Sequence, residues 1–145
     1  MKRNVRLILL RNYLIIGIFL NFFLTAVAMG SSADMSPEDY CLLAIQHLEQ
    51  EVGHFKVLID LAGQYKDAPE ALAKQEGIKQ EEFKRAAEGL CATYGITFNE
   101  FAVYMGRNGK VVNTYLKEHP EIRDTINTLS SELSSLLTTL ESCKQ

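Results

Sequence analysis

Apolar residues recur three and four positions apart along two stretches of this chain. The first series comprises Cys41, Ile45, Leu48, Val52, Phe55, Ile59 and Ala62. The second comprises Ile122, Ile126, Leu129, Leu133, Leu136, Leu140 and Cys143. This spacing places all members of a series on one face of an α-helix. We therefore predict two long helices, at about 37–65 and 120–143, whose apolar faces pack against each other.

Helix start signals stand at the beginning of both stretches. Ser36-Pro37-Glu38 supplies an N-cap hydroxyl, a proline in the first turn and an acidic side chain, and Pro120-Glu121 repeats the last two features. No stretch alternates between polar and apolar residues as a strand would, so we predict an all-α fold, a small helical bundle. Because the two apolar series have equal length, we expect the two long helices to be antiparallel.

The segment between the long helices carries one motif twice, 18 residues apart. Gly77-Ile78-Lys79 precedes Phe83, and Gly95-Ile96-Thr97 precedes Phe101. In the second copy Thr97 can cap a helix, Glu100 can complete a capping box, and the isoleucine and phenylalanine form a hydrophobic staple. Lysine cannot cap in this way, so the first copy is expected to fray. We interpret both copies as helix boundaries rather than as a duplicated functional unit.

Further glycines and prolines divide this middle segment. A brief helix is predicted to start near Pro69 and to end at Gly77. Gly106 and Gly109 each cost about 1 kcal/mol inside a helix, so we predict a break between helices near 97–106 and 109–118. The middle of the chain would then hold three or four short helices. An aromatic cluster in their core is expected from Tyr94, Phe98, Phe101, Tyr104 and Tyr115.

Residues 1–28 differ from the rest of the chain. They contain four bases and no acid, an apolar stretch from Tyr13 to Leu24, and small residues at Ala26 and Ala28. This pattern predicts a secretory signal peptide at 1–28, a flexible leader at 29–35 and a single helical domain at 36–145. An uncleaved membrane anchor is the alternative, although the 16 residues from Tyr13 to Ala28 span only about 24 Å of a hydrocarbon core about 30 Å thick. We expect an exported protein, periplasmic or secreted.

Subtracting the predicted signal peptide changes the charge balance. The formal net charge moves from −3 to −7, with 11 bases against 18 acids. This acidity argues against a nucleic-acid partner and against docking on anionic lipid, so no membrane contact is expected after cleavage of the signal.

Three cysteines would enter an oxidising compartment. Cys41 begins the first apolar series and Cys143 ends the second, so antiparallel packing would bring them together. We predict a Cys41–Cys143 disulfide, with Cys91 as a buried free thiol. Two alternatives stay open: a Cys41–Cys91 disulfide that leaves Cys143 free, and three cysteines that act as small apolar residues without any bond.

His47, Glu51 and His54 share one face of the first long helix. The Glu51-x-x-His54 spacing also occurs in di-iron four-helix bundles, which need a second copy of the motif and two further carboxylates. This chain has one copy. Each histidine follows a residue of the apolar series by two positions, which points it away from that face. We therefore expect a solvated surface, with these three residues as candidate divalent-metal ligands, and predict no cofactor.

Motifs for catalysis are absent from the sequence. It contains no nucleophile elbow, phosphate-binding glycine loop, paired cysteine zinc ligands or haem attachment motif, and we predict that the protein is not an enzyme. Four leucines, however, lie off the first apolar series. They would form a surface for a protein partner or for self-association if the middle helices left them exposed. These residues are Leu42, Leu43, Leu58 and Leu61.

Two functional hypotheses follow from these features. The first is an exported, non-catalytic protein-binding or envelope accessory module. The alternative is a small-ligand or divalent-metal-binding protein that uses His47, Glu51 and His54. A third hypothesis, an enzyme whose acid and base meet only in the fold, would need a pocket with a carboxylate of raised pKa.

Overall fold

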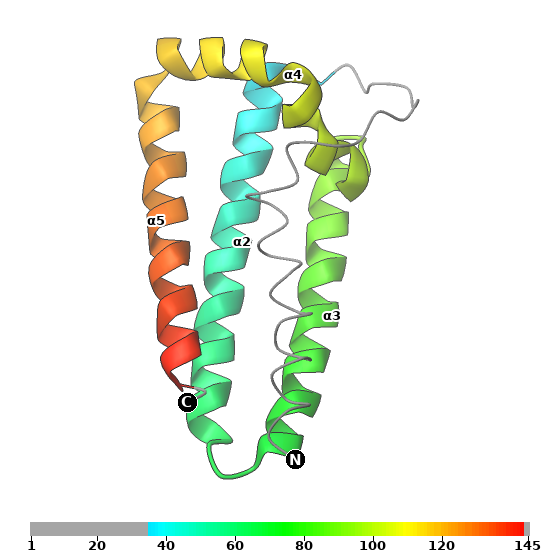
Figure 1. Ribbon diagram of the computed structural model, residues 1–145. Helices are drawn as coiled ribbons and strands as arrows, with labels where there is room; N and C mark the ends of the chain where they lie inside the picture. Colours follow the sequence, from blue (N-terminus) through cyan, green and yellow to red (C-terminus); the bar gives the residue numbers. More distant parts are fainter. Residues whose placement is uncertain (1–34, 144–145) are drawn as a thin grey trace.

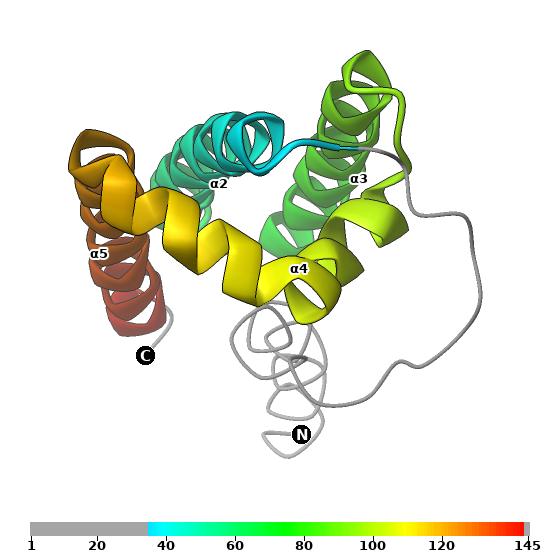
Figure 2. The same ribbon diagram turned by 90° about the horizontal axis from the view of Figure 1, so that it is seen from above.

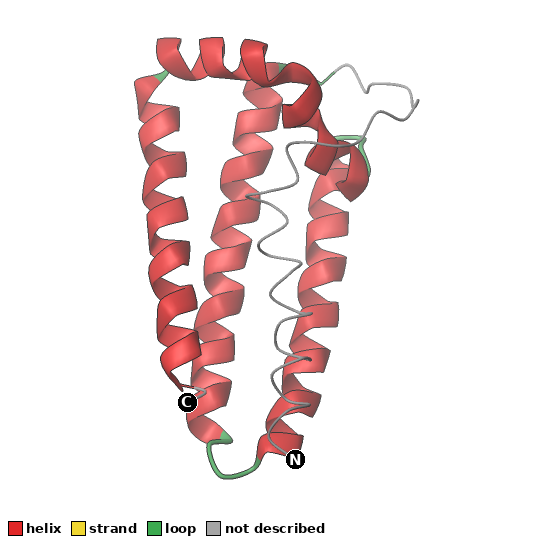
Figure 3. Ribbon diagram, in the orientation of Figure 1, coloured by secondary structure: helices red, strands yellow, loops and turns green. Residues whose placement is uncertain are grey.

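The computed structural model describes residues 35–143, which form four consecutive α-helices. These are α2 (Pro37–Gln64), α3 (Pro69–Thr93), α4 (Phe98–Glu118) and α5 (Pro120–Cys143). Figure 3 shows helices joined by short loops, and no strand occurs within the described range. The all-α class is confirmed, as are the ranges of the first and last helices to within one residue. The predicted signal peptide at 1–28 lies outside the described residues.

Helix α2 is the centre of the arrangement. Helices α3 and α5 pack along two different sides of it, and α4 crosses the end at which α2 begins (Figures 1 and 2). The chain descends along α2, returns along α3, crosses through α4 and descends again along α5. The expected antiparallel pairing of α2 and α5 is therefore wrong. The two helices run parallel, because α4 lies across the bundle and α5 begins at the same end as α2.

Side-chain contacts fix the register of this parallel pair. Phe55, Leu58 and Ala62 of α2 form a buried cluster with Leu140 of α5. We call this the aliphatic cluster; half-buried side chains at its edge are Ile59, Leu61, Leu133, Leu136 and Leu137. On the outside, Lys56 Nζ lies 2.8 Å from Glu132 Oε1. The apolar faces predicted for the two helices do pack against each other, but the helices run parallel and not antiparallel.

The boundary between α3 and α4 matches its sequence signals. Gly95 adopts a positive φ of 71°, which a residue with a side chain rarely adopts. Thr97 Oγ1 accepts the backbone N–H of Glu100 at 3.2 Å, and the Glu100 carboxylate accepts the backbone N–H of Thr97 at 2.7 Å. Ile96 and Phe101 lie in one buried cluster with Leu43 and Cys91. The second copy of the repeated motif is thus a helix boundary.

The other two predicted interruptions are wrong. Helix α3 continues through Gly77, because Lys79 offers no acceptor to a free backbone N–H and packing on α2 outweighs the cost of one interior glycine. Helix α4 continues through Gly106 and Gly109, bending along its length in Figure 1 instead of ending. Asn108 does not cap a new helix; its Nδ2 donates to the carbonyl oxygen of Tyr104 within α4. Two helices of 25 and 21 residues replace the three or four short ones.

The predicted Cys41–Cys143 disulfide is not formed, and all three cysteines are free. Cys41 lies near the beginning of α2, whereas Cys143 is the last residue of α5, at the other end of the bundle. Their separation is close to the length of α5, roughly 35 Å. A disulfide requires Cα atoms within about 7 Å, so the parallel arrangement excludes the bond. Cys41 and Cys91 are buried and Cys143 is exposed.

None of the helices between residues 35 and 143 combines the length and apolar composition that a bilayer span requires.

Candidate functional site

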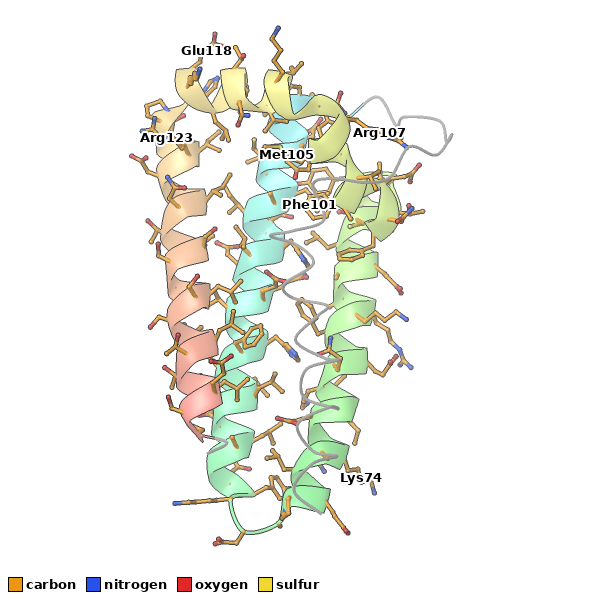
Figure 4. The ribbon with its side chains drawn as sticks, in the orientation of Figure 1. Lys74, Phe101, Met105, Arg107, Glu118 and Arg123 are labelled. Atoms are coloured by element: carbon orange, nitrogen blue, oxygen red, sulfur yellow. The ribbon has the colours of Figure 1, made fainter. Side chains whose placement is uncertain are left out.

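His47 lies in the interior of the protein, with 4% of its surface exposed. Rings from two other helices surround its imidazole: the centroid distances are 5.8 Å to Phe83 of α3, and 5.5 and 5.7 Å to Phe98 and Phe101 of α4. Figure 4 shows Phe101 between α4, α2 and α3, while the charged Lys74 and Arg123 lie on the outside. The prediction that His47 faces solvent is wrong. Helix α2 packs on α5 along one side and on α3 and α4 along another, and His47 lies on the side that contacts α3 and α4.

Glu51 lies one helical turn after His47 on the same side of α2. Its Oε1 is 3.7 Å from Nε2 of the imidazole, and its side chain is 13% exposed. Burial disfavours the charged form of each group. It lowers the pKa of His47 from 6.5 to about 4 and raises the pKa of Glu51 from 4.5 to about 7. A histidine and a carboxyl group that both favour their neutral forms thus stand side by side.

His54, one turn further, makes contacts with α3. Its ring stacks on Phe83 with a centroid distance of 4.7 Å, and its Nε2 lies 3.3 Å from Oε1 of Gln80. With the proton on Nε2, the imidazole donates a hydrogen bond to this amide oxygen. Burial lowers the pKa of His54, and the hydrogen bond to Gln80 acts in the opposite direction. Gln80 and Phe83 are site residues that the sequence analysis did not assign.

The three candidate metal ligands do not form a metal centre. They lie on one side of α2, as their spacing requires, but Glu51 approaches His47 while His54 engages Gln80 and Phe83. Within residues 35–143, no three histidine, cysteine, aspartate or glutamate side chains are placed to hold a metal ion. What the helix brings together is a polar strip whose two histidines contact aromatic rings of α3 and α4.

Further aromatic rings extend from this strip to the first described residue. Tyr40 stacks on Tyr104 at 4.7 Å and lies 5.3 Å from Phe101. The hydroxyl of Tyr104 donates to the carbonyl oxygen of Met35 at 2.7 Å. Burial raises the pKa of Tyr40 to about 12, so its hydroxyl stays protonated. Of the expected aromatic cluster, Phe98, Phe101 and Tyr104 lie together here, and both phenylalanines contact His47, whereas Tyr115 stacks on His119 instead.

The leucine surface expected for a partner is mostly interior. Leu43 is fully buried, Leu58 belongs to the aliphatic cluster and Leu61 packs at its edge, whereas Leu42 is 39% exposed. The middle helices and α5 have covered the remaining three. Other large apolar side chains exposed on the described helices are Val57, Ile78 and Val111.

Comparison with known proteins returned no similar family, no similar curated protein and no similar solved structure.

Proposed function

We propose that the protein is an exported, non-catalytic helical protein that binds a small organic cation on the side of α2 that packs on α3 and α4. The binding residues would be His47, Glu51 and His54, with Gln80 and Phe83 of α3. The observation that carries this proposal is that Glu51, itself 13% exposed, lies against the buried His47, whose imidazole contacts three phenylalanine rings. Export remains an inference from residues 1–28.

The placement of this pair is costly for folding alone. Burying ionisable groups away from water opposes folding, and well-packed apolar side chains of similar size often stabilise such a position more. Ionisable groups with strongly shifted pKa values gather at functional sites. Small-molecule sites likewise combine aromatic or apolar walls with a few polar groups. His47, which contacts Glu51 on one side and the rings of Phe83 and Phe101 on others, gives this place a similar composition.

The charge of the site favours a cation. Glu51 supplies a carboxyl group whose pKa of about 7 lets it ionise when a positive charge arrives. The faces of aromatic rings attract cations, most of all where water is excluded. The predicted mature chain has a formal net charge of −7, which raises the local concentration of cations and lowers that of anions. An ammonium group on an apolar body therefore fits better than a carboxylate.

A protein-partner function has less support than it had from the sequence. It depended on leucines left exposed by the fold, and Leu43, Leu58 and Leu61 lie in the interior or at its edge.

The test compares three probes that share one ring and differ in charge: benzylamine, benzamide and benzoate. Each is titrated into the purified protein at pH 7 while NMR follows the imidazole signals. We expect benzylamine to shift the signals of His47 and His54 most, benzamide less and benzoate least. The signal of His119, which lies between α4 and α5 and away from this site, should stay unchanged.

Variants separate binding at this site from attraction to an acidic surface. Glu51→Gln should abolish the benzylamine shifts, because the amide cannot take a negative charge. Glu49→Gln, the same change at an exposed position of α2, should leave them unchanged. Equal shifts with all three probes, or equal loss in both variants, would contradict the proposal.

A further inference from the structure

His47 and Glu51 titrate in opposite senses while sharing one buried environment. Burial favours an imidazole without its extra proton and a carboxyl group with its proton. The buried pair in this state holds one proton, on Glu51. Exposed to water near pH 5.5, the same two groups also hold one proton, but it resides on the imidazole and the carboxyl group is ionised. The number of protons is the same in both environments, and only their location differs.

We propose that burial in the interface of α2 with α3 and α4 moves one proton from the imidazole of His47 to the carboxyl group of Glu51. An N–H bond breaks and an O–H bond forms, and no proton is exchanged with solvent. Opening the interface reverses the transfer and converts a neutral pair into an ion pair. This device is independent of any ligand, so its test and that of the proposed function can fail separately.

The geometry favours the neutral pair over a buried ion pair. The 3.7 Å between Nε2 and Oε1 is longer than a charge-assisted hydrogen bond, which would be needed to offset desolvation of both charges. Three phenylalanine rings occupy the surroundings of the imidazole.

Three neighbouring titratable groups, one on each of these helices, are in their neutral forms near pH 5.5. Burial raises the pKa of Tyr40 on α2, of Cys91 on α3 and of Tyr104 on α4. These groups thus add no negative charge that would hold a proton on His47.

The consequence is an interface whose stability depends little on pH. A lowered histidine pKa weakens the closed state as pH falls from 6.5 towards 4, and a raised carboxyl pKa weakens it as pH rises from 4.5 towards 7. The two effects oppose each other. Together they change the opening equilibrium between pH 4 and pH 8 far less than either group alone, which would change it on the order of 100-fold.

The first test uses two single variants, Glu51→Gln and His47→Gln. Urea unfolding is measured at pH 4, 5.5 and 8, and the unfolding constant of each variant is divided by that of the wild-type protein, which removes the contributions of all other titrating groups. For Glu51→Gln this ratio should rise on the order of 100-fold from pH 8 to pH 4. For His47→Gln the ratio should instead rise by a similar factor from pH 4 to pH 8. Glu49→Gln, at an exposed position, should give a constant ratio.

A second test uses the wild-type protein and therefore decides the matter even if a variant does not fold. NMR at pH 5.5 should show a neutral imidazole for His47 and a protonated carboxyl group for Glu51. An imidazolium next to an ionised carboxylate would overturn the proposal, as would ratios that change in the same direction for both variants.

Discussion

The two packed sides of α2 differ in chemistry. Towards α5, the helix presents Phe55, Leu58 and Ala62, which pack on Leu140 in a cluster without ionisable groups. Towards α3 and α4, it presents His47 and its neighbours, in contact with aromatic rings. One helix therefore combines an ordinary apolar contact with a contact in which ionisable side chains are buried.

The difference shows how the fold can accommodate a polar strip in its interior. Burial of apolar surface is non-directional and independent of pH, so the α2–α5 contact stabilises the bundle under all conditions. The α2–α3 contact loses part of that gain to desolvation of His47 and Glu51. We infer that the apolar packing of the aliphatic cluster offsets the free energy that desolvation of His47 and Glu51 costs on the other side of α2.

The largest effect is expected from a truncation on the aliphatic side. Leu140 is 1% exposed, and Leu140→Ala removes its contacts with α2 and leaves a cavity. We expect a loss of about 3 kcal/mol in the free energy of unfolding, measured by urea denaturation with circular dichroism. Because no titrating group lies in this cluster, the loss should be the same at pH 5.5 and pH 8.

The matched control is the same substitution at Leu42, which is 39% exposed. Leu42→Ala should cost less than about 1 kcal/mol, because much of its surface is already in water. Equal losses in the two variants would show that α5 is not held by the aliphatic cluster.

A smaller effect is expected on the other side, at the backbone that positions α4 over His47. Gly95 has a φ of 71°, so Gly95→Ala should destabilise the protein by about 1 kcal/mol and displace Phe98 and Phe101. The displacement is read from the imidazole signal of His47, whose pKa should move back towards its ordinary value as packing loosens.

Gly77→Ala is the control for this substitution, because Gly77 belongs to the other copy of the same sequence motif. It lies inside α3, and an added Cβ would meet nothing within 4 Å. We therefore expect a gain of up to about 1 kcal/mol from higher helix propensity, without a change at His47. A loss at Gly77 or a gain at Gly95 would contradict the structural difference between the two copies.

This pair of glycines also illustrates what local sequence can predict. The boundary at Gly95 was predictable because Thr97 and Glu100 supply a complete set of capping partners. The motif at Gly77 has the same spacing but lacks a capping side chain, so the helix continues. Likewise, the first residues of α2 and α5 were predictable from Ser36, Pro37 and Pro120, whose effects on the backbone are local.

Helix direction and the candidate site were not predictable in this way. Two equal apolar series are compatible with parallel and antiparallel packing, and the direction of α5 depends on α4, which was expected to break. The second buried side of α2, towards α3 and α4, follows Leu43, His47, Glu51 and His54 at helical spacing. Two histidines within this stripe concealed it, since a histidine by itself is as compatible with solvent as with a core. Phe83 and Gln80 reach it only through tertiary packing.

The smallest effect is expected from the ion pair on the outer surface of the α2–α5 contact. Lys56 and Glu132 lie 2.8 Å apart, but their side chains are 57% and 41% exposed. A double-mutant cycle with Lys56→Gln and Glu132→Gln should give a coupling free energy of at most about 0.5 kcal/mol, which high salt reduces further. A coupling well above 1 kcal/mol would mean that charge, rather than the aliphatic cluster, sets the register of α5. A small coupling beside a large loss for Leu140→Ala would assign the register to apolar packing.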